Sequence, residues 1–69
     1  MTEVIFIVEE EPDGGFVAKG LGVSIYTQAD TKEELDLNVR EAVSLHYEGS
    51  PNPPKMIRLH YVRDEVLAI

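Results

Sequence analysis

The five consecutive apolar residues Val4 to Val8 constrain the fold of this chain more than any other segment. An unbroken run of β-branched and aromatic residues is typical of a strand that is covered on both faces. With 69 residues the chain is one domain, and it buries only about 60% of the surface that it exposes when unfolded. It has no cysteine, so no disulfide supports this small core. With so small a core, the fold must cover both faces of the strand at Val4 to Val8.

Turn residues and changes of hydrophobic pattern divide the rest of the chain. Pro12-Asp13-Gly14-Gly15 predicts a tight turn between the first strand and a returning strand at 16–19. The pattern then predicts a third strand at 23–27, a helix from Thr31 to about Glu48, a proline-rich connector, and a fourth strand at 56–62. A right-handed crossover brings the fourth strand beside the first. We therefore predict an α+β fold, β-β-β-α-β, with a four-stranded sheet of order 3-2-1-4 and one helix on one face.

The helix carries its own start signal and an apolar stripe. Thr31 and Glu34 fit a capping box, and Gly49 is a plausible residue just beyond the helix end. At 100° per residue, one stripe faces the sheet and contains Leu35, Val39, Ala42, Val43 and Leu45. Leu37 falls on the opposite, polar face, which predicts an isolated exposed leucine.

One helix covers one face of the sheet, yet the first strand is apolar on both. Ile5 and Ile7 point away from the helix side and need a second cover. Residues 63–69 form an apolar C-terminal tail with Val66, Leu67 and Ile69, and it could supply that cover from the same chain or from another. We predict a homo-oligomer, a dimer or higher, with these five residues as the candidate interface.

The charge of the chain is strongly negative and unevenly distributed. Residues 1–48 hold 11 acidic and 3 basic side chains, whereas residues 49–69 hold 2 and 3. A negative field repels nucleic-acid phosphates and would steer a basic protein partner into encounter. On charge alone, however, an acidic surface that keeps a small protein in solution is the favoured interpretation. No basic leader and no apolar stretch near the roughly 20 residues of a membrane span is visible, so we predict a cytoplasmic location and no membrane contact.

Few residues offer catalytic or metal chemistry. Glu9, Glu10 and Glu11 are the one carboxylate run, and a metal-dependent nuclease would need further carboxylates such as Asp30 and Glu34 beside them. His46 and His60 lie on different predicted elements, which is weak support for a zinc site because zinc needs three or four converging ligands. We predict no enzyme activity, no metal and no cofactor.

Three segments resemble HicB-like antitoxin domains: Asp13-Gly14-Gly15-Phe16-Val17-Ala18 after an acidic strand end, Thr27-Gln28-Ala29-Asp30-Thr31, and Lys32-Glu33-Glu34-Leu35. The resemblance implies that residues 1–69 are a single HicB-like domain with a partial RNase H-like fold. It also implies that the protein binds and neutralises a small basic RNA-cleaving toxin of the HicA type.

Two features depart from the HicB-like pattern. Ala29 stands where family members usually have glycine, and the sequence shows no helix-turn-helix or ribbon-helix-helix segment for DNA. The candidate surface for a protein partner is Glu9, Glu10, Glu11 and Leu37. The alternatives are an orphan domain without a toxin partner and a degenerate metal-dependent nuclease.

Overall fold

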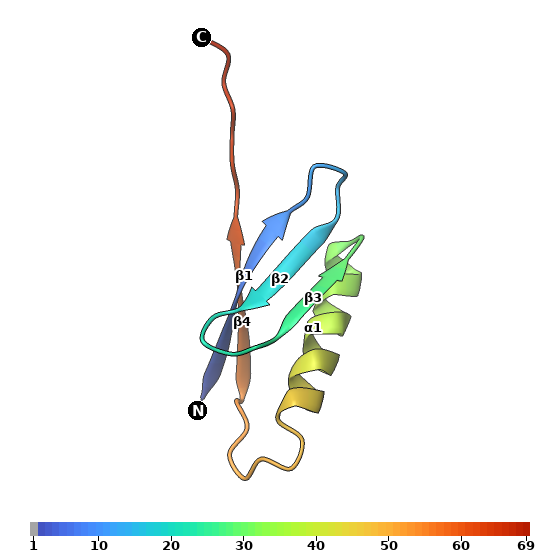
Figure 1. Ribbon diagram of the computed structural model, residues 1–69, viewed down its shortest axis with the longest axis vertical. Coiled ribbons are helices and arrows are strands. Elements are labelled where there is room, and N and C mark those ends of the chain that lie inside the picture. The colour runs from blue at the N-terminus through green and yellow to red at the C-terminus, as the bar shows by residue number, and fades with distance from the viewer. Residues whose placement is uncertain (1) are drawn as a thin grey trace.

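The computed structural model describes residues 2–69, which form one sheet and one helix (Figure 1). Met1, the first residue of the predicted domain, lies outside the described residues. The elements in chain order are β1 (Glu3–Glu10), β2 (Phe16–Gly20), β3 (Tyr26–Ala29), α1 (Lys32–His46) and β4 (Met56–Val62). This order confirms the predicted β-β-β-α-β arrangement.

β1 is a central strand, as its apolar run predicts. The sheet order is β3-β2-β1-β4, with β2 antiparallel and β4 parallel to β1. In the β1–β4 ladder Val4 lies opposite Ile57 and Phe6 opposite Leu59. Directly opposite residues share a face of the sheet, so these four side chains lie on the helix side.

The predicted turn between β1 and β2 is present. Gly14 has φ +98°, a left-handed conformation that suits glycine. The backbone N–H of Glu11 donates to the Gly15 carbonyl at 2.7 Å, and the N–H of Gly15 donates to Asp13 Oδ1 at 3.3 Å. The turn is therefore held both by the backbone and by the aspartate side chain.

The third strand begins three residues later than predicted, at Tyr26 rather than Val23. The backbone N–H of Gly20 donates to the Ile25 carbonyl at 2.8 Å, which turns the chain back before pairing begins. A Cβ at Gly20 would lie 2.5 Å from Val23 Cγ2, so the loop between β2 and β3 packs against Gly20 too closely for any other residue. Ile25 is buried although it lies in the loop.

The helix starts as predicted and ends slightly earlier. The N–H of Glu34 donates to Thr31 Oγ1 at 3.1 Å, which confirms the cap. α1 ends at His46 with Tyr47 as C-cap, whereas the sequence predicted an end near Glu48. Gly49 has φ +80° and takes the left-handed position beyond the helix.

The core lies between α1 and the sheet. Leu35, Val39 and Val43 are buried from the helix, and they pack with residues such as Phe6 and Val8 from β1. The prediction for Leu45 was wrong, since its side chain is 64% exposed. α1 lies mainly over β2 and β3 and leaves β4 less covered (Figure 1). Fewer residues of the predicted apolar stripe of the helix are therefore buried than expected.

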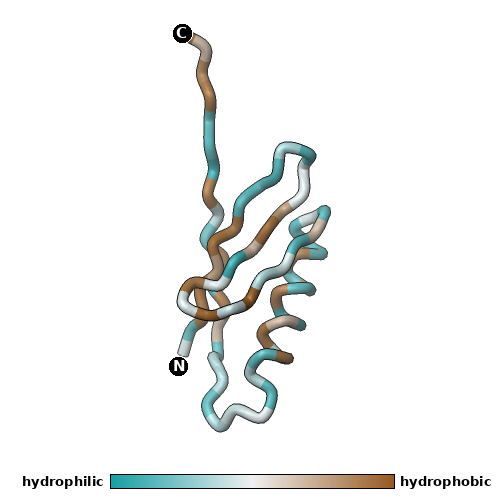
Figure 2. Tube along the Cα trace, in the orientation of Figure 1, coloured by the Kyte–Doolittle hydropathy of each residue, from teal (hydrophilic) through white to brown (hydrophobic). Residues whose placement is uncertain are grey.

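The second face of β1 has no helix over it. Ile5 and Ile7 are half-buried there, beside Arg58 and His60 of β4. The C-terminal segment, residues 63–69, does not fold back onto this face. It continues away from the end of β4, which gives the described residues an extent of 53 × 20 × 17 Å (Figures 1 and 2).

Candidate functional site

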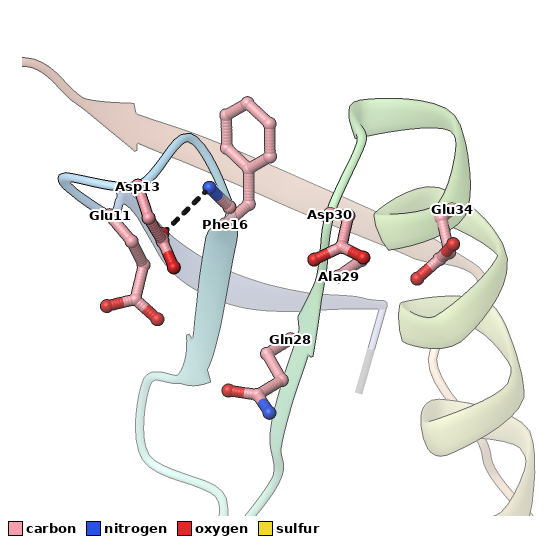
Figure 3. A pocket seen from close by; sticks show the side chains of 8 residues that line it. Glu11, Asp13, Phe16, Gln28, Ala29, Asp30 and Glu34 are labelled. Atoms are coloured by element: carbon pink, nitrogen blue, oxygen red, sulfur yellow. Dashed lines mark hydrogen bonds between the residues drawn. The ribbon is translucent and has the colours of Figure 1, made fainter.

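An acidic hollow lies at the end of the sheet where β1 turns into β2 and β3 runs into α1 (Figure 3). Its volume is about 330 Å³, and it is open to solvent. The residues that line it are Glu11, Asp13, Gly15, Phe16, Gln28, Ala29, Asp30 and Glu34. We call this set the acidic hollow.

Two local structures hold its carboxylates in place. Glu11 and Asp13 belong to the β1–β2 turn, which backbone hydrogen bonds hold together, and the Asp13 carboxylate also accepts a hydrogen bond from the Gly15 N–H. Asp30 and Glu34 flank the Thr31 cap at the start of α1. The strand ladder places Phe16 opposite Ala29, so the turn and the cap lie at the same end of the sheet.

Gly15 lies between the two groups of carboxylates. A Cβ at this residue would lie 3.3 Å from the Ala29 carbonyl oxygen, 3.7 Å from Asp13 Oδ1 and 4.0 Å from Asp30 Oδ1. The absence of a side chain keeps the space between these two carboxylates open.

The hollow is suited to cationic groups. Four of its eight lining residues are acidic, and no lysine or arginine is among them. An ammonium or guanidinium group of a partner would therefore meet carboxylates from both sides. Within residues 2–69, no three His, Cys, Asp or Glu side chains are arranged to hold a metal ion.

The three predicted glutamates do not act as one group. Glu9, Glu10 and Glu11 are all exposed around the end of β1, yet only Glu11 lines the acidic hollow. Together they also border two further surface hollows, one beside Val62 and one beside Tyr26. Asp13 was not predicted as a site residue, and the only site in which the sequence suggested Asp30 and Glu34 was a metal site.

The remaining candidate residues lie elsewhere. Leu37 is 64% exposed on α1, as predicted, but it lines none of the three hollows beside the glutamates. Val66, Leu67 and Ile69 are at least three-quarters exposed on the C-terminal segment. The structure does not bring them against Ile5 and Ile7 within one chain.

A contact that involves a charged side chain lies on each face of the β1–β4 pair. Arg58 Nη2 lies 2.9 Å from Glu3 Oε2, and this hydrogen bond lowers the pKa of the Glu3 carboxyl. On the helix side, Lys32 Nζ lies 5.0 Å from the centre of the Tyr61 ring. Burial and the charge of Asp36 raise the pKa of the Tyr61 hydroxyl.

The two histidines lie apart from these contacts. His46 is exposed and packs edge-on against the Tyr47 ring, with centroids 4.8 Å apart. His60 is exposed on β4, opposite Ile7.

These features define a class: a small α+β domain with a mixed four-stranded sheet, one helix and an acidic hollow at one end. Two curated relatives identify the family of this domain. The chain is 40% identical over 68 residues to a UPF0150 protein of Thermotoga maritima, a match that covers 97% of this chain and 93% of the relative. It is 50% identical over 50 residues to a UPF0150 protein of Archaeoglobus fulgidus, with 72% and 74% covered. The chain belongs to the UPF0150 family.

The other comparisons add no closer assignment. No family profile matches the sequence, and no solved structure matches it. The single helix described, α1, is too short and too polar to cross a membrane.

Proposed function

We propose that this protein is a non-enzymatic protein-binding module that acts as an antitoxin, neutralising a small basic RNA-cleaving toxin of the HicA type in the cytoplasm. The acidic hollow is the observation that carries the proposal. Four carboxylates from two separate elements surround an open space without a compensating cation. Such a surface favours a partner that presents lysine or arginine side chains.

The resemblance of residues 13–18 and 27–35 to HicB-like domains supports the same proposal, because these segments build both walls of the hollow. The names of the two relatives give a family and no activity. The negative field also repels phosphates, so we expect the domain to bind the toxin rather than its RNA.

The test is calorimetry of the full chain with the small basic protein encoded beside it. We expect binding that weakens with added salt, and loss of RNA cleavage by the partner when this chain is present. A neighbouring product that is not basic, or that does not bind, overturns the antitoxin proposal.

A double variant locates the binding surface. Glu11→Gln with Asp13→Asn removes two charges from the hollow, and the asparagine oxygen can still accept the hydrogen bond from Gly15. Exposed ion pairs contribute about 0.2–1 kcal/mol each, so the affinity should fall about 2- to 30-fold. The control is Glu48→Gln, an exposed carboxylate beyond the other end of α1. Equal affinities of the two variants would show that the hollow is not the surface that binds.

A further inference from the structure

A groove remains open between α1 and β4 on the helix side of the sheet. It has a volume of about 140 Å³ and is lined by Asp36, Val39 and Arg40 from α1 and by Ile57 and Leu59 from β4. Val39 is 1% exposed at the base of the groove, whereas Ile57 and Leu59 are only half-buried. These two β4 side chains lack cover on the side away from α1.

β4 is also an edge strand. It pairs with β1 along its whole length, and its other edge has no partner among the described residues. Residues 63–69 continue from it in an extended path, with Val66 93% and Leu67 76% exposed (Figure 1). An unpaired edge next to exposed apolar side chains is a template for pairing with another chain.

We propose that two copies of this chain pair antiparallel along β4 and residues 63–69, so that each copy's C-terminal segment forms an added strand on the β4 edge of the other. Leu67 and Ile69 of one copy then pack beside Leu59 and Ile57 of the other. They cover the side of these two residues that α1 leaves open. The occupant of the β4 edge is therefore a second copy of the same segment.

The alternation of side chains restricts the register. Ile57, Leu59 and Tyr61 lie on the helix side, so continued alternation places Arg63, Glu65, Leu67 and Ile69 on that side. A twofold axis perpendicular to the sheet keeps each face on its own side, so helix-side residues lie opposite helix-side residues. Only registers centred on a residue, such as Val62, Arg63 or Asp64, meet this condition. The register centred on Asp64 places no residue of 63–69 opposite Ile57, so it leaves part of the groove open.

The register centred on Arg63 fits the groove. It places Leu67 opposite Leu59 and Ile69 opposite Ile57, which are apolar pairs that stabilise a sheet. The register centred on Val62 places Glu65 opposite Leu59 and brings a carboxylate beside the apolar groove. Burial of such a charge is unfavourable.

The charges in this register offset one another in part. Glu65 of one copy lies opposite Tyr61 of the other, on the side of the sheet where Lys32 Nζ lies over the Tyr61 ring. This brings a carboxylate towards an ammonium group. The two copies of Arg63 face each other at the axis, which is unfavourable for like charges, and a Glu65 carboxylate diagonally across from each offsets part of this repulsion.

Single cysteine variants test the register directly, because the chain has no cysteine of its own. Under the proposal, Arg63→Cys lies opposite its own copy, with Cα atoms about 4.5–5.5 Å apart, which is within the range of a disulfide. In Val62→Cys and Asp64→Cys the two copies of the cysteine are displaced by two positions and lie about 7–8 Å apart. At low micromolar protein in a glutathione buffer, we expect Arg63→Cys to form a disulfide-linked dimer at least about tenfold faster than its two neighbours. Fastest cross-linking of Val62→Cys or of Asp64→Cys, or equal rates at all three positions, overturns the proposed register.

The mass in solution tests the interface itself. We expect the wild-type chain to have twice its monomer mass of 7.7 kDa. Leu67→Asp should weaken self-association about 30-fold or more, the magnitude expected for a residue central to an interface. The control is Leu45→Asp, because Leu45 is 64% exposed on α1 and lies away from the β4 edge. A wild-type chain that stays at 7.7 kDa at millimolar concentration, or a Leu67→Asp dimer as tight as the control, overturns the proposal.

Discussion

Leu35 and Leu37 form a matched pair for testing how α1 is oriented. They are the same residue type, two positions apart on one helix, yet Leu35 is 0% exposed and Leu37 is 64% exposed. Replacing a fully buried leucine by alanine costs about 2–5 kcal/mol of unfolding free energy, because apolar contacts are lost and a cavity remains. Replacing an exposed leucine costs about 0.5 kcal/mol or less, since few contacts are lost and alanine is the better helix former.

The magnitude is large relative to the stability of so small a domain. At about 0.05–0.15 kcal/mol per residue, the 69 residues have an unfolding free energy of about 3–10 kcal/mol. Leu35→Ala should therefore remove about a fifth or more of the total, whereas Leu37→Ala should leave it nearly unchanged.

Urea unfolding followed by far-UV circular dichroism measures both variants. All three proteins are compared at one protein concentration, because self-association would add a concentration-dependent stability. The expected result is a lower midpoint for Leu35→Ala with an unchanged slope. Equal losses in both variants, or a larger loss for Leu37→Ala, would refute the placement of the helix on the sheet.

Three further predictions concern local contacts. Thr31→Ala removes the oxygen that caps α1 and should cost about 1 kcal/mol in the same urea experiment, with Thr31→Ser restoring most of it. Gly20→Ala places a Cβ 2.5 Å from Val23 Cγ2 and should lower the unfolding free energy by about 1–3 kcal/mol. Adding Val23→Ala should recover part of this loss. An unchanged stability of Gly20→Ala would contradict the packing described. Arg58→Ala should raise the pKa of Glu3 towards its usual 4.5, as followed by an NMR pH titration. Because that pKa is lowered in the folded state, the stabilising contribution of the pair is present above about pH 4.5 and is lost as the pH falls through the lowered value.

The sequence predicted the topology because its signals are local and agree with one another. The Asp13-Gly14 turn, the Thr31 cap and the run Val4 to Val8 each fix one element or its place in the sheet. β4 was predicted with its observed bounds because prolines end the connector before it and the strand continues to Val62.

The predictions were wrong at residues whose structure depends on tertiary packing rather than on local sequence. Val23 and Ser24 continue the alternating pattern of the strand, but the close packing at Gly20 holds them in a loop. Leu45 belongs to the apolar stripe by periodicity, yet α1 lies over β2 and β3 in a position that leaves this residue exposed.

The acidic hollow was the feature least accessible to sequence reasoning. Asp13 is explained by a turn, and Asp30 and Glu34 are explained by a helix start, so each already has a local structural role. Only the pairing of Phe16 with Ala29 places the turn beside the cap. The run Glu9–Glu11 attracted attention because it is contiguous, although just one of its members borders the hollow.

The parallel pairing of β1 with β4 has a consequence for the order in which the chain folds. β1, β2, β3 and α1 are neighbours in sequence and can form their contacts locally, whereas β4 must cross the helix and the connector to reach β1. Pairing across such a separation is slow because the loop must close first. We therefore expect β1 to remain an open edge until late in folding. During synthesis on the ribosome, this edge would stay unpaired until the last of the four strands has left the exit tunnel.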